Sequence, residues 1–429
     1  MNIILPRKVH FIGVAGVGMS ALAQLMADGG AQITGSDNAW FPTLKAIEKY
    51  GIPFTIGYKA ENIPRDTELV VHTDAVPVDN VERIEAHRRG IPQQSYFEAL
   101  GKISTGKRTV AVAGTHGKTT TTGMLARILR DAGASPTAVV GSIVKDFVSN
   151  YLSGTSDLFI VEACEYRDHL LELSPQVLVI TNLEWDHTDW FPSLEILQKT
   201  FQRAIERVPK NGAIITDLSN KNIAPLLAST KAHIVDYMNE PAYKLSLQGE
   251  FNQMNARAAA AAARVVLPHI LDATIARSLA EFQGTWRRFE YKGVTAHGAD
   301  VYDDYAHHPT AIRVTLKALR MKTKGKIFVA FHPHLYSRTR DLLSEFATAF
   351  GDADRVLVAP IYAAREVDDG TISSETLAAR IRATGTNATA FDSFDAIERV
   401  LNEVGKDDVI MTMGAGDIYK VADTLVARK

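Results

Sequence analysis

The 429-residue sequence predicts an α/β protein of three domains, each built around a mainly parallel sheet. Its length exceeds what one hydrophobic core usually organises. Runs of β-branched residues alternate along the chain with segments whose apolar residues recur at helical spacing, which is the βαβ pattern. We expect the domains to cover residues 1–104, 105–292 and 293–429.

Composition excludes several classes of function. The chain is 46% hydrophobic and 22% charged, which is typical of a soluble globular protein. Its 47 Lys and Arg nearly balance 49 Asp and Glu, so no electrostatic footprint for nucleic acid or a membrane surface is expected. Cys164 is the single cysteine, which excludes an internal disulfide, and residues 1–13 run into a strand without a charged leader. We expect a cytoplasmic protein, a monomer or weak homodimer.

The stretch AGTHGKTTT, residues 113–121, has the layout of a triphosphate site. It follows the β-branched run at 109–113 and opens a helical pattern, so backbone N–H groups and the helix dipole favour phosphate there. Its GxxGKT is shorter than the common P-loop string, and a Gly-containing turn with an exposed lysine is the alternative. The central domain is therefore expected to be P-loop ATPase-type. The predicted ATP-binding residues of this loop are Gly114, Thr115, His116, Gly117, Lys118, Thr119 and Thr120.

The first domain is predicted to be Rossmann-like. Strands are expected at 8–14 and 32–37, a loop at 13–20, and a helix from 21 to about 30. An acid lies about 20 residues past the Gly-rich turn, as in dinucleotide sites, but Ala15 stands where that motif needs glycine. We predict a diphosphate-binding turn of another kind; a purely structural turn and a dehydrogenase are the alternatives. The predicted binding residues are Gly13, Gly16, Gly18, Met19, Ser20, Ser36 and Asp37.

Acidic residues end two further expected strands of the central domain, at 157–165 and from 177. Ligands bind beyond the carboxyl ends of strands in open α/β sheets. Glu162 suits Mg²⁺, which prefers hard oxygens, whereas a histidine such as His187 is more often a hydrogen-bonding or acid/base group. Asp186 and Asp189 are expected either to join this cluster or to cap the helix that starts near residue 193.

The last domain is predicted to be a second Rossmann-like α/β unit. Before it, the helix at 249–267 begins with Asn252, which suits either a purine edge or a cap, and FQGTWRRFEYKG carries two arginines suited to phosphate. Expected strands end in DDYAHHP and in HPHLYSRTR. Arg338 suits a carboxylate, and a solvated helix face is the alternative for Arg338 and Arg340.

Taken in order, these motifs resemble the Mur ligase family, the ATP-dependent amide-forming enzymes that build the peptidoglycan stem peptide. The likeness runs the full length of the chain, and seven ordered matches are far more specific than one. The motifs that carry it are GTHGKTT, EACE, TNLEWDHTD, GEFNQMNARAA, GTWRRFE, YDDYAHHPTAI and MGAGDIYK.

Within the family, IGVAGVGMSALA, TGSD, DDYAHHP and PHLYSRTRDLL most resemble members that join L-alanine to the lactyl carboxylate of UDP-N-acetylmuramate. The resemblance implies phosphoryl transfer from ATP to that carboxylate, an acyl phosphate, attack by the amine, and release of ADP and phosphate. The alternative is the member that attaches recycled L-Ala-γ-D-Glu-diaminopimelate. A non-catalytic nucleotide-binding regulator is a rival from another class.

The resemblance also implies roles for residues. Asn252 would read adenine, Asp304 would bind the ribose, and the loop from Gly13 to Gly18 would hold the UDP diphosphate. Three positions depart from the family pattern: Phe251, Leu335 and the string EACEY. The implied catalytic residues are Lys118, Glu162, His187, Arg287 and Arg288. The implied Mg²⁺ ligands are Thr119, Glu162 and His187. The implied amino-acid-binding residues are Tyr305, His308, His334 and Arg338.

Overall fold

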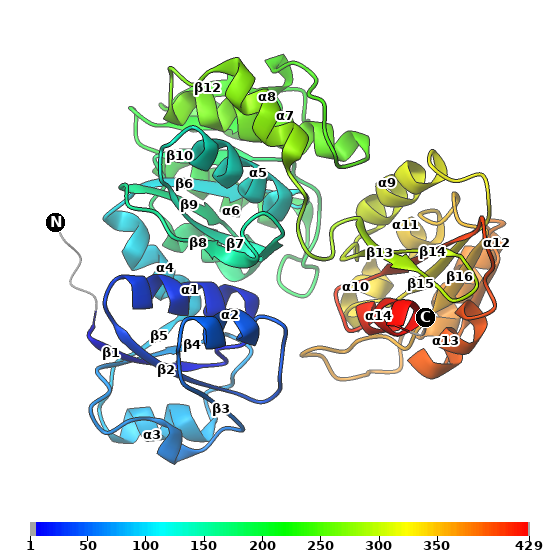
Figure 1. Ribbon diagram of the computed structural model, residues 1–429, viewed down its shortest axis with the longest axis horizontal. Coiled ribbons are helices and arrows are strands. Elements are labelled where there is room, and N and C mark those ends of the chain that lie inside the picture. The colour runs from blue at the N-terminus through cyan, green and yellow to red at the C-terminus, as the bar shows by residue number, and fades with distance from the viewer. Residues whose placement is uncertain (1–5, 428–429) are drawn as a thin grey trace. The chain divides into compact units, whose positions relative to one another are not determined.

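Three sheets follow one another along the chain in the computed structural model, which describes residues 6–427 (Figure 1). Each sheet is parallel apart from one antiparallel strand pair in the second and one in the third. The α/β organisation predicted from the sequence is therefore confirmed. The expected entry of the chain into the first strand involves residues 1–5, which lie outside the described residues.

The first sheet has the order β3-β2-β1-β4-β5 and is parallel throughout. The order reverses beside β1, and such a switch point is where ligands bind in open α/β sheets. Helices α1 and α2 lie on one face and α3 on the other (Figure 1). The strands are β1 Lys8–Ile12, β2 Gln32–Asp37, β3 Phe54–Ile56, β4 Leu69–His72 and β5 Gln93–Ser95. The helices are α1 Val17–Asp28, α2 Leu44–Lys49, α3 Val81–Arg88 and α4 Tyr96–Thr105.

The second sheet has the order β12-β11-β10-β6-β9-β7-β8, with β8 antiparallel to β7. Strand β6 lies between β10 and β9, so the loop after β6 is flanked by the ends of both. The strands are β6 Arg108–Ala113, β7 Thr137–Val144, β8 Ser149–Leu152, β9 Leu158–Glu162, β10 Val177–Ile180, β11 Ala213–Thr216 and β12 His233–Asp236. The α-helices are α5 Lys118–Asp131, α6 Leu194–Arg207, α7 Glu250–Val266 and α8 Asp272–Glu281.

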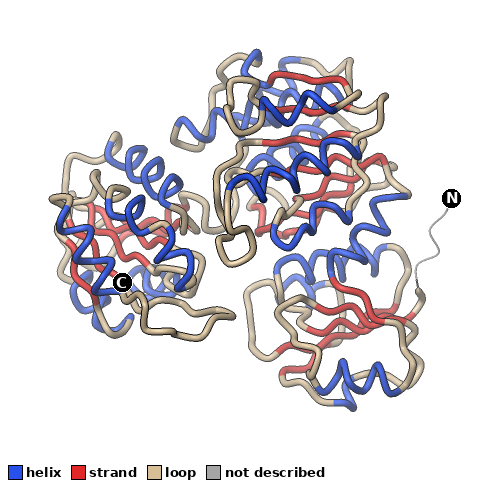
Figure 2. Tube along the Cα trace, turned by 180° about the vertical axis from the view of Figure 1, so that it is seen from behind, coloured by secondary structure: helices blue, strands red, loops and turns tan. Residues whose placement is uncertain are grey.

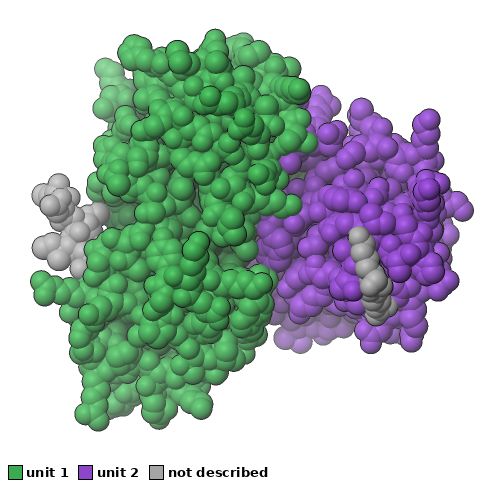
Figure 3. All heavy atoms as spheres, viewed as in Figure 1, with its two compact units in different colours: residues 1–184, 195–246, 254–285 green, residues 185–194, 247–253, 286–429 purple. Residues whose placement is uncertain are grey.

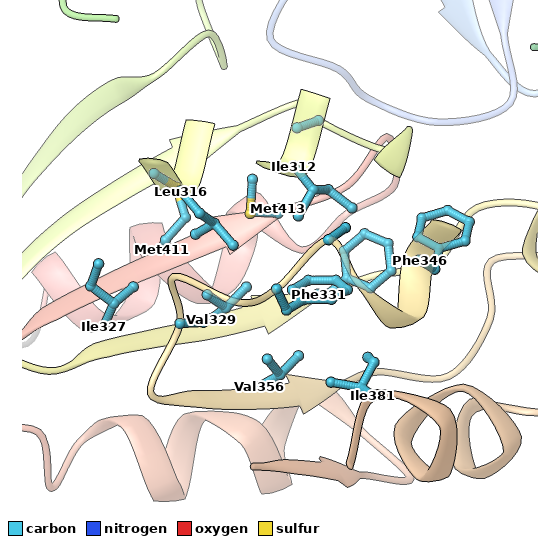
Figure 4. Packing of buried hydrophobic residues seen from close by; sticks show 14 of the residues in the cluster. Ile312, Leu316, Ile327, Val329, Phe331, Phe346, Val356, Ile381, Met411 and Met413 are labelled. Atoms are coloured by element: carbon cyan, nitrogen blue, oxygen red, sulfur yellow. The ribbon is translucent and has the colours of Figure 1, made fainter. Parts of the chain in front are cut away.

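The third sheet has the order β13-β14-β18-β15-β16-β17, and helices lie on both sides of it (Figure 2). Phe331 and Phe346 pack with aliphatic side chains in its core (Figure 4). The strands are β13 Glu290–Val294, β14 Asp300–Asp304, β15 Ile327–Phe331, β16 Arg355–Val358, β17 Ala388–Ala390 and β18 Val409–Met413. The helices are α9 Pro309–Arg320, α10 Tyr336–Asp341, α11 Leu343–Ala347, α12 Ser374–Ala383, α13 Phe394–Leu401 and α14 Tyr419–Ala427.

Internal contacts divide the chain into two compact units (Figure 3). Unit 1 comprises residues 1–184, 195–246 and 254–285, and holds the first two sheets. Unit 2 comprises 185–194, 247–253 and 286–429. Trp185 and Phe251, one from each short segment of unit 2, pack against the core of the third sheet. The domain limits at 104 and 292 stay a prediction, and β13 spans the second of them.

Several elements end at other residues than expected. Helix α1 begins at Val17, so Gly18, Met19 and Ser20 lie on its first turns rather than in a loop. Strands β9 and β10 end at Glu162 and Ile180, and side chains a few residues further on, Glu165 and Asn182, bond to the loop after β6. Among residues 6–427, no helix has the length and apolarity needed to cross a bilayer.

Candidate active site

The loop from Gly114 to Gly117 joins β6 to α5 and needs glycine at both ends. Gly114 has φ +122° and Gly117 has φ +82°, in the region that favours glycine. A Cβ on Gly114 would lie 2.3 Å from Thr181 Oγ1, and one on Gly117 would lie 2.2 Å from Asn255 Oδ1. The predicted strand, loop and helix are confirmed. Thr181 and Asn255 pack closely against the two glycines of the loop.

Gly117→Ala is expected to weaken ATP binding at least about tenfold, because both the left-handed backbone and Asn255 oppose a methyl group there. Gly133→Ala is the matched control: Gly133 has φ +77° but nothing within 4 Å of a Cβ. The control should lose about 1 kcal/mol of stability and keep its affinity. Titration calorimetry with a non-hydrolysable ATP analogue measures both, and equal losses of affinity would contradict the prediction.

The two residues that follow β10, Thr181 and Asn182, hydrogen-bond to the loop after β6. Asn182 accepts from the His116 N–H at 2.9 Å and donates to the His116 carbonyl at 3.0 Å. Thr181 Oγ1 donates to the same carbonyl at 2.6 Å, and the Thr115 N–H donates to the Asn182 carbonyl. The loop is therefore held in shape by its neighbour strand. Thr181 is not among the residues predicted for this site, and its only signal in the sequence is its place directly after an apolar strand.

Lys118 lies at the first position of α5, and its ammonium group turns back over the loop. It donates to the carbonyl oxygens of Gly114 and Thr115 and to Glu165 Oε1 at 3.0 Å. Burial opposes its charge, but the Glu165 carboxylate and its neighbours outweigh burial and raise the pKa of Lys118. A charged ammonium group is thus held over the loop that is predicted to bind phosphate.

Thr119 and Glu162 come together, as predicted. Thr119 Oγ1 donates to Glu162 Oε1 at 3.0 Å, and the N–H of Gly141 donates to Glu162 Oε2 at 2.7 Å. A hydroxyl and a carboxylate beside a phosphate loop are hard oxygen ligands of the kind Mg²⁺ prefers, so the donor set fits this ion. His187 belongs to unit 2, so a metal site that it shares with Thr119 and Glu162 stays a prediction.

The Gly-rich turn of the first sheet is also held from within. Gly13 has φ +85°, and its N–H and that of Val14 both donate to the Ser36 carbonyl. Asp37 is 5% exposed and accepts from the N–H groups of Ala15 and Asn38, each at 2.8 Å. Burial raises the pKa of Asp37. Its carboxylate thus shapes the turn, and its contact with a nucleoside stays a prediction.

The other predicted residues of this turn lie close to it but differ in environment. Ser36 is buried, and its hydroxyl donates to Glu82 Oε2 at 2.5 Å. Gly18 faces Tyr96, whose ring would lie 2.6 Å from a Cβ, so glycine there lets α1 approach α4. Met19 and Ser20 are buried on α1. Gly16 precedes α1 as its N-cap residue.

Arg287 lies inside unit 2 with all three guanidinium nitrogens bonded. It donates to Asp303 Oδ2 at 2.8 Å and to the carbonyls of Gly416 at 2.8 Å and Gly414 at 2.6 Å. It is 3% exposed. These bonds tie the start of the third sheet to the MGAGD turn, and any catalytic role of Arg287 stays a prediction. Arg288 is half-buried over the Tyr305 ring.

Asp304 ends β14 and is buried. Its oxygens accept from the N–H groups of Phe289 at 3.0 Å and Ala306 at 2.9 Å. Burial raises the pKa of Asp304 to about 6. Asn252, in the first turn of α7, is 3% exposed and donates to the Gln248 carbonyl at 2.6 Å. Their predicted contacts with ribose and adenine are not tested by these bonds.

A buried ion pair lies between Asp186 and Arg338 in unit 2. Nε and Nη2 of Arg338 both lie 2.8 Å from Asp186 Oδ1, and Nη1 donates to His334 Nδ1 at 3.0 Å. Burial alone would raise the pKa of Asp186, but Arg338 holds it well below its ordinary value. Burial and, to a smaller extent, the positive charge of Arg338 lower the pKa of His334 to about 3. The His334 ring is therefore neutral, and its Nδ1 accepts the hydrogen bond from Arg338. The solvated-face alternative is therefore wrong for Arg338 and fits only the exposed Arg340.

Further histidines line the same part of unit 2. His308 caps α9 through Nδ1, which accepts from the Thr310 N–H, so its Nε2 carries the proton shared with the Trp185 carbonyl at 3.1 Å. His187 has φ +53°, and its carbonyl accepts from two N–H groups three and four residues ahead. Asp186 pairs with Arg338, and Asp189 pairs with Arg365. Both carboxylates therefore have partners inside unit 2, and their capping of α6 stays a prediction.

The fold and the loop at Gly114 to Lys118 together define a multi-sheet α/β nucleotide-binding protein, with hard-oxygen ligands beside its phosphate loop. Three family sequence models match the chain: the Mur ligase family catalytic domain at residues 8–108, the Mur ligase middle domain at 112–244, and the Mur ligase glutamate ligase domain at 287–416. The chain belongs to the Mur ligase family, whose members are ATP-dependent ligases.

Individual relatives agree with this assignment. The chain is 34% identical to the UDP-N-acetylmuramate–L-alanine ligase of Clostridium acetobutylicum, covering 98% of both chains. It is 36% identical to the ligase of that name from Clostridium botulinum strain Langeland, covering 98% of this chain and 97% of that one. The solved UDP-N-acetylmuramate–alanine ligase of Thermotoga maritima is similar with TM-score 0.80, 29% identity and 98% coverage of both chains. A murein peptide ligase from Psychrobacter arcticus, 24% identical with TM-score 0.75, shares the fold.

Proposed function

We propose that this protein joins L-alanine to the lactyl carboxylate of UDP-N-acetylmuramate while ATP is converted to ADP and phosphate. The observation that carries the proposal is the preformed loop with Lys118 above it and Thr119 beside Glu162, in a chain whose full-length relatives bear that ligase name. The setting remains the one expected from the sequence: a cytoplasmic monomer or weak homodimer in peptidoglycan precursor synthesis.

The reaction needs an activated carboxylate, because direct attack by an amine would have to expel oxide. Transfer of the γ-phosphoryl group to the lactyl carboxylate gives an acyl phosphate, and the amine nitrogen of L-alanine then displaces phosphate. Two anions must meet for the first step, so charge neutralisation dominates the barrier. Lys118 is the charged group of this loop, and its ammonium is held over the loop by carbonyl oxygens and Glu165.

Thr119 and Glu162 would hold Mg²⁺, which supplies further positive charge to the phosphate oxygens when bound. The hydrogen bond from Gly141 to Glu162 fixes the orientation of the carboxylate, so one oxygen is directed at Thr119. We propose His187 as a third group for the metal. Arg287 and Arg288 are proposed to contribute positive charge from the start of the third sheet.

Tyr305, His308, His334 and Arg338 are proposed to hold the amino acid. Two guanidinium nitrogens of Arg338, Nε and Nη2, bind Asp186. Arg338 would therefore influence a substrate carboxylate through its third nitrogen, Nη1, and through His334, to which Nη1 donates. His334 is half-buried and can reach an entering ligand, whereas Arg338 is 2% exposed. Asn252, Asp304 and the Gly13–Gly18 turn keep their proposed contacts with adenine, ribose and the UDP diphosphate.

A phosphate-release assay tests the proposal. With ATP, Mg²⁺ and UDP-N-acetylmuramate present, we expect release to depend on L-alanine and to be at least about tenfold slower with glycine or L-serine. Release that depends only on L-Ala-γ-D-Glu-diaminopimelate would assign the protein to tripeptide recycling. A change of nicotinamide absorbance, or no release with any amine, would overturn the ligase assignment.

A further inference from the structure

The segment that follows β9 contacts two loops at once within unit 1. At its start, Glu165 is 1% exposed and accepts from Lys118, at the end of the loop after β6. Four residues on, His169 Nε2 lies 2.7 Å from Asp74 Oδ2, in the loop after β4. The segment from Glu165 to His169 therefore reaches from the second sheet to the carboxyl edge of the first.

The backbone between these two contacts has an unusual course. Arg167 and Asp168 have φ of 51° and 62°, which kinks the 3-10 helix Tyr166–Glu172. Two consecutive non-glycine residues in the left-handed region persist only where surrounding contacts fix them. Asp168 accepts from Thr200 on α6, and this bond anchors the kink to the second sheet. The segment is thus held rigidly at its middle as well as at both ends.

The far end of the segment is packed as closely as the near end. The Phe97 ring stacks on His169 with centroids 3.7 Å apart and planes 14° apart. Among residues 6–427, His169 Nδ1 is buried and has no hydrogen-bond partner, so the ring is oriented by Asp74 at Nε2 and by its stacking on Phe97. The hydrogen bond from His169 lowers the pKa of Asp74, which is consistent with a charge-assisted contact.

Asp74 is linked through the neighbouring residue, Thr73, to the Gly13 turn that is proposed to bind the sugar nucleotide. Thr73, its neighbour, lies so close to Gly13 that a Cβ there would be 2.4 Å from the Thr73 methyl group. A shift of Asp74 would therefore move Thr73, which packs against Gly13. In the other direction, phosphate oxygens that attract Lys118 compete with its bond to Glu165, and so change the force on the segment.

We propose that Glu165–His169 is a strut that couples the triphosphate loop to the Gly13 turn, with His169 and Asp74 as positioning residues for the sugar nucleotide. The proposal rests on the function proposed above, because it takes the Gly13 turn as the UDP-binding turn. Its consequence is reciprocal: a bound ATP analogue and bound UDP-N-acetylmuramate change one another's affinity by the same factor.

Other contacts hold the two sheets of unit 1 together, so the strut can be broken without separating them. Asn150 on β8 donates to Ser20 Oγ on α1 at 3.0 Å, and Tyr151 donates to Asp28 at 2.7 Å. Asp28 is the last residue of α1, at the opposite end of the helix from the Gly13 turn, so the bond from Tyr151 involves neither loop. Tyr151→Phe is therefore a matched control, since it removes one hydrogen bond from the same junction but none from the strut.

The test measures the dissociation constant of UDP-N-acetylmuramate by calorimetry on the full chain, with and without a non-hydrolysable ATP analogue and Mg²⁺. For His169→Asn we expect the coupling factor to fall at least about fivefold and the KM for UDP-N-acetylmuramate to rise, with affinity for the ATP analogue alone within about twofold of wild type. His169→Gln should retain most of the coupling, because its amide nitrogen can take the place of Nε2.

Three results would overturn the strut. They are an unchanged coupling factor in His169→Asn, an equal loss in Tyr151→Phe, and a His169→Gln variant as impaired as His169→Asn. Each of these can occur while the wild-type chain binds and turns over its substrates, and then only the strut fails. A wild-type chain that does not bind UDP-N-acetylmuramate would overturn the proposed function together with the strut.

Discussion

Lys118→Met is expected to lower kcat by at least about a hundred- to a thousandfold, because it removes the charge that lies over the phosphate loop. The substitution also removes the ammonium group that pairs with Glu165, which is 1% exposed. Breaking a buried pair at one end costs about 3–5 kcal/mol, so the single variant should be less stable as well as inactive. Phosphate release and calorimetric unfolding of the full chain measure the two effects.

The double variant Lys118→Met with Glu165→Gln separates them. Removing both charges should restore much of the stability, since a neutral amide needs no buried counterion. Turnover should stay at the level of Lys118→Met, because the ammonium group is still missing. If the double variant regained turnover along with stability, Lys118 would only support the loop, and its assignment as the phosphate-binding cation would be wrong.

Local sequence patterns predicted the elements around the phosphate loop well. The β-branched run before Gly114 and the 3.6-residue spacing of apolar residues after Lys118 fix β6 and α5 through interactions of near neighbours. The glycines at 114 and 117 indicate positions where the backbone has a positive φ, a conformation that few other residues adopt. Both signals are local, and for that reason one sequence is enough to read them.

Partners that are distant in the chain could not be predicted in this way. Arg287 bonds to the carbonyls of residues 127 and 129 positions away, although its sequence context suggested a phosphate ligand. Asp186 bonds to Arg338 at a separation of 152 residues, and residues 185–194 belong to unit 2 rather than to the unit of the strand that precedes them. Such pairs are decided by tertiary packing, and a charged residue looks the same in sequence whether it meets a substrate or another side chain.

Arg338→Met is expected to destabilise unit 2 by about 3–5 kcal/mol at pH 7, because Asp186, 3% exposed, would keep its charge without a counterion. Arg340→Met is the matched control on the same helix, α10. Arg340 pairs with Asp341 and Asp369 at the surface, and such pairs contribute about 0–1 kcal/mol. Calorimetry of the full chain, with hydrogen exchange of peptides over 327–341, measures the loss and places it in unit 2.

The pH dependence of this loss distinguishes a missing counterion from a packing defect. In the wild type the pKa of Asp186 is held well below its ordinary value, so the stability that the pair contributes is present above that ordinary value and is lost only as the pH falls below it. Without Arg338, burial still opposes the charge of Asp186 and only the neighbouring histidines favour it, so we expect the pKa of Asp186 to rise. The variant should then be most destabilised at neutral pH and recover as the carboxyl takes up a proton. The stability gap between wild type and variant should therefore narrow steadily from pH 7 to pH 4. A gap that stays constant over this range would mean that the cost comes from the cavity left by the guanidinium group, and that the charge of Asp186 is neutralised by another group.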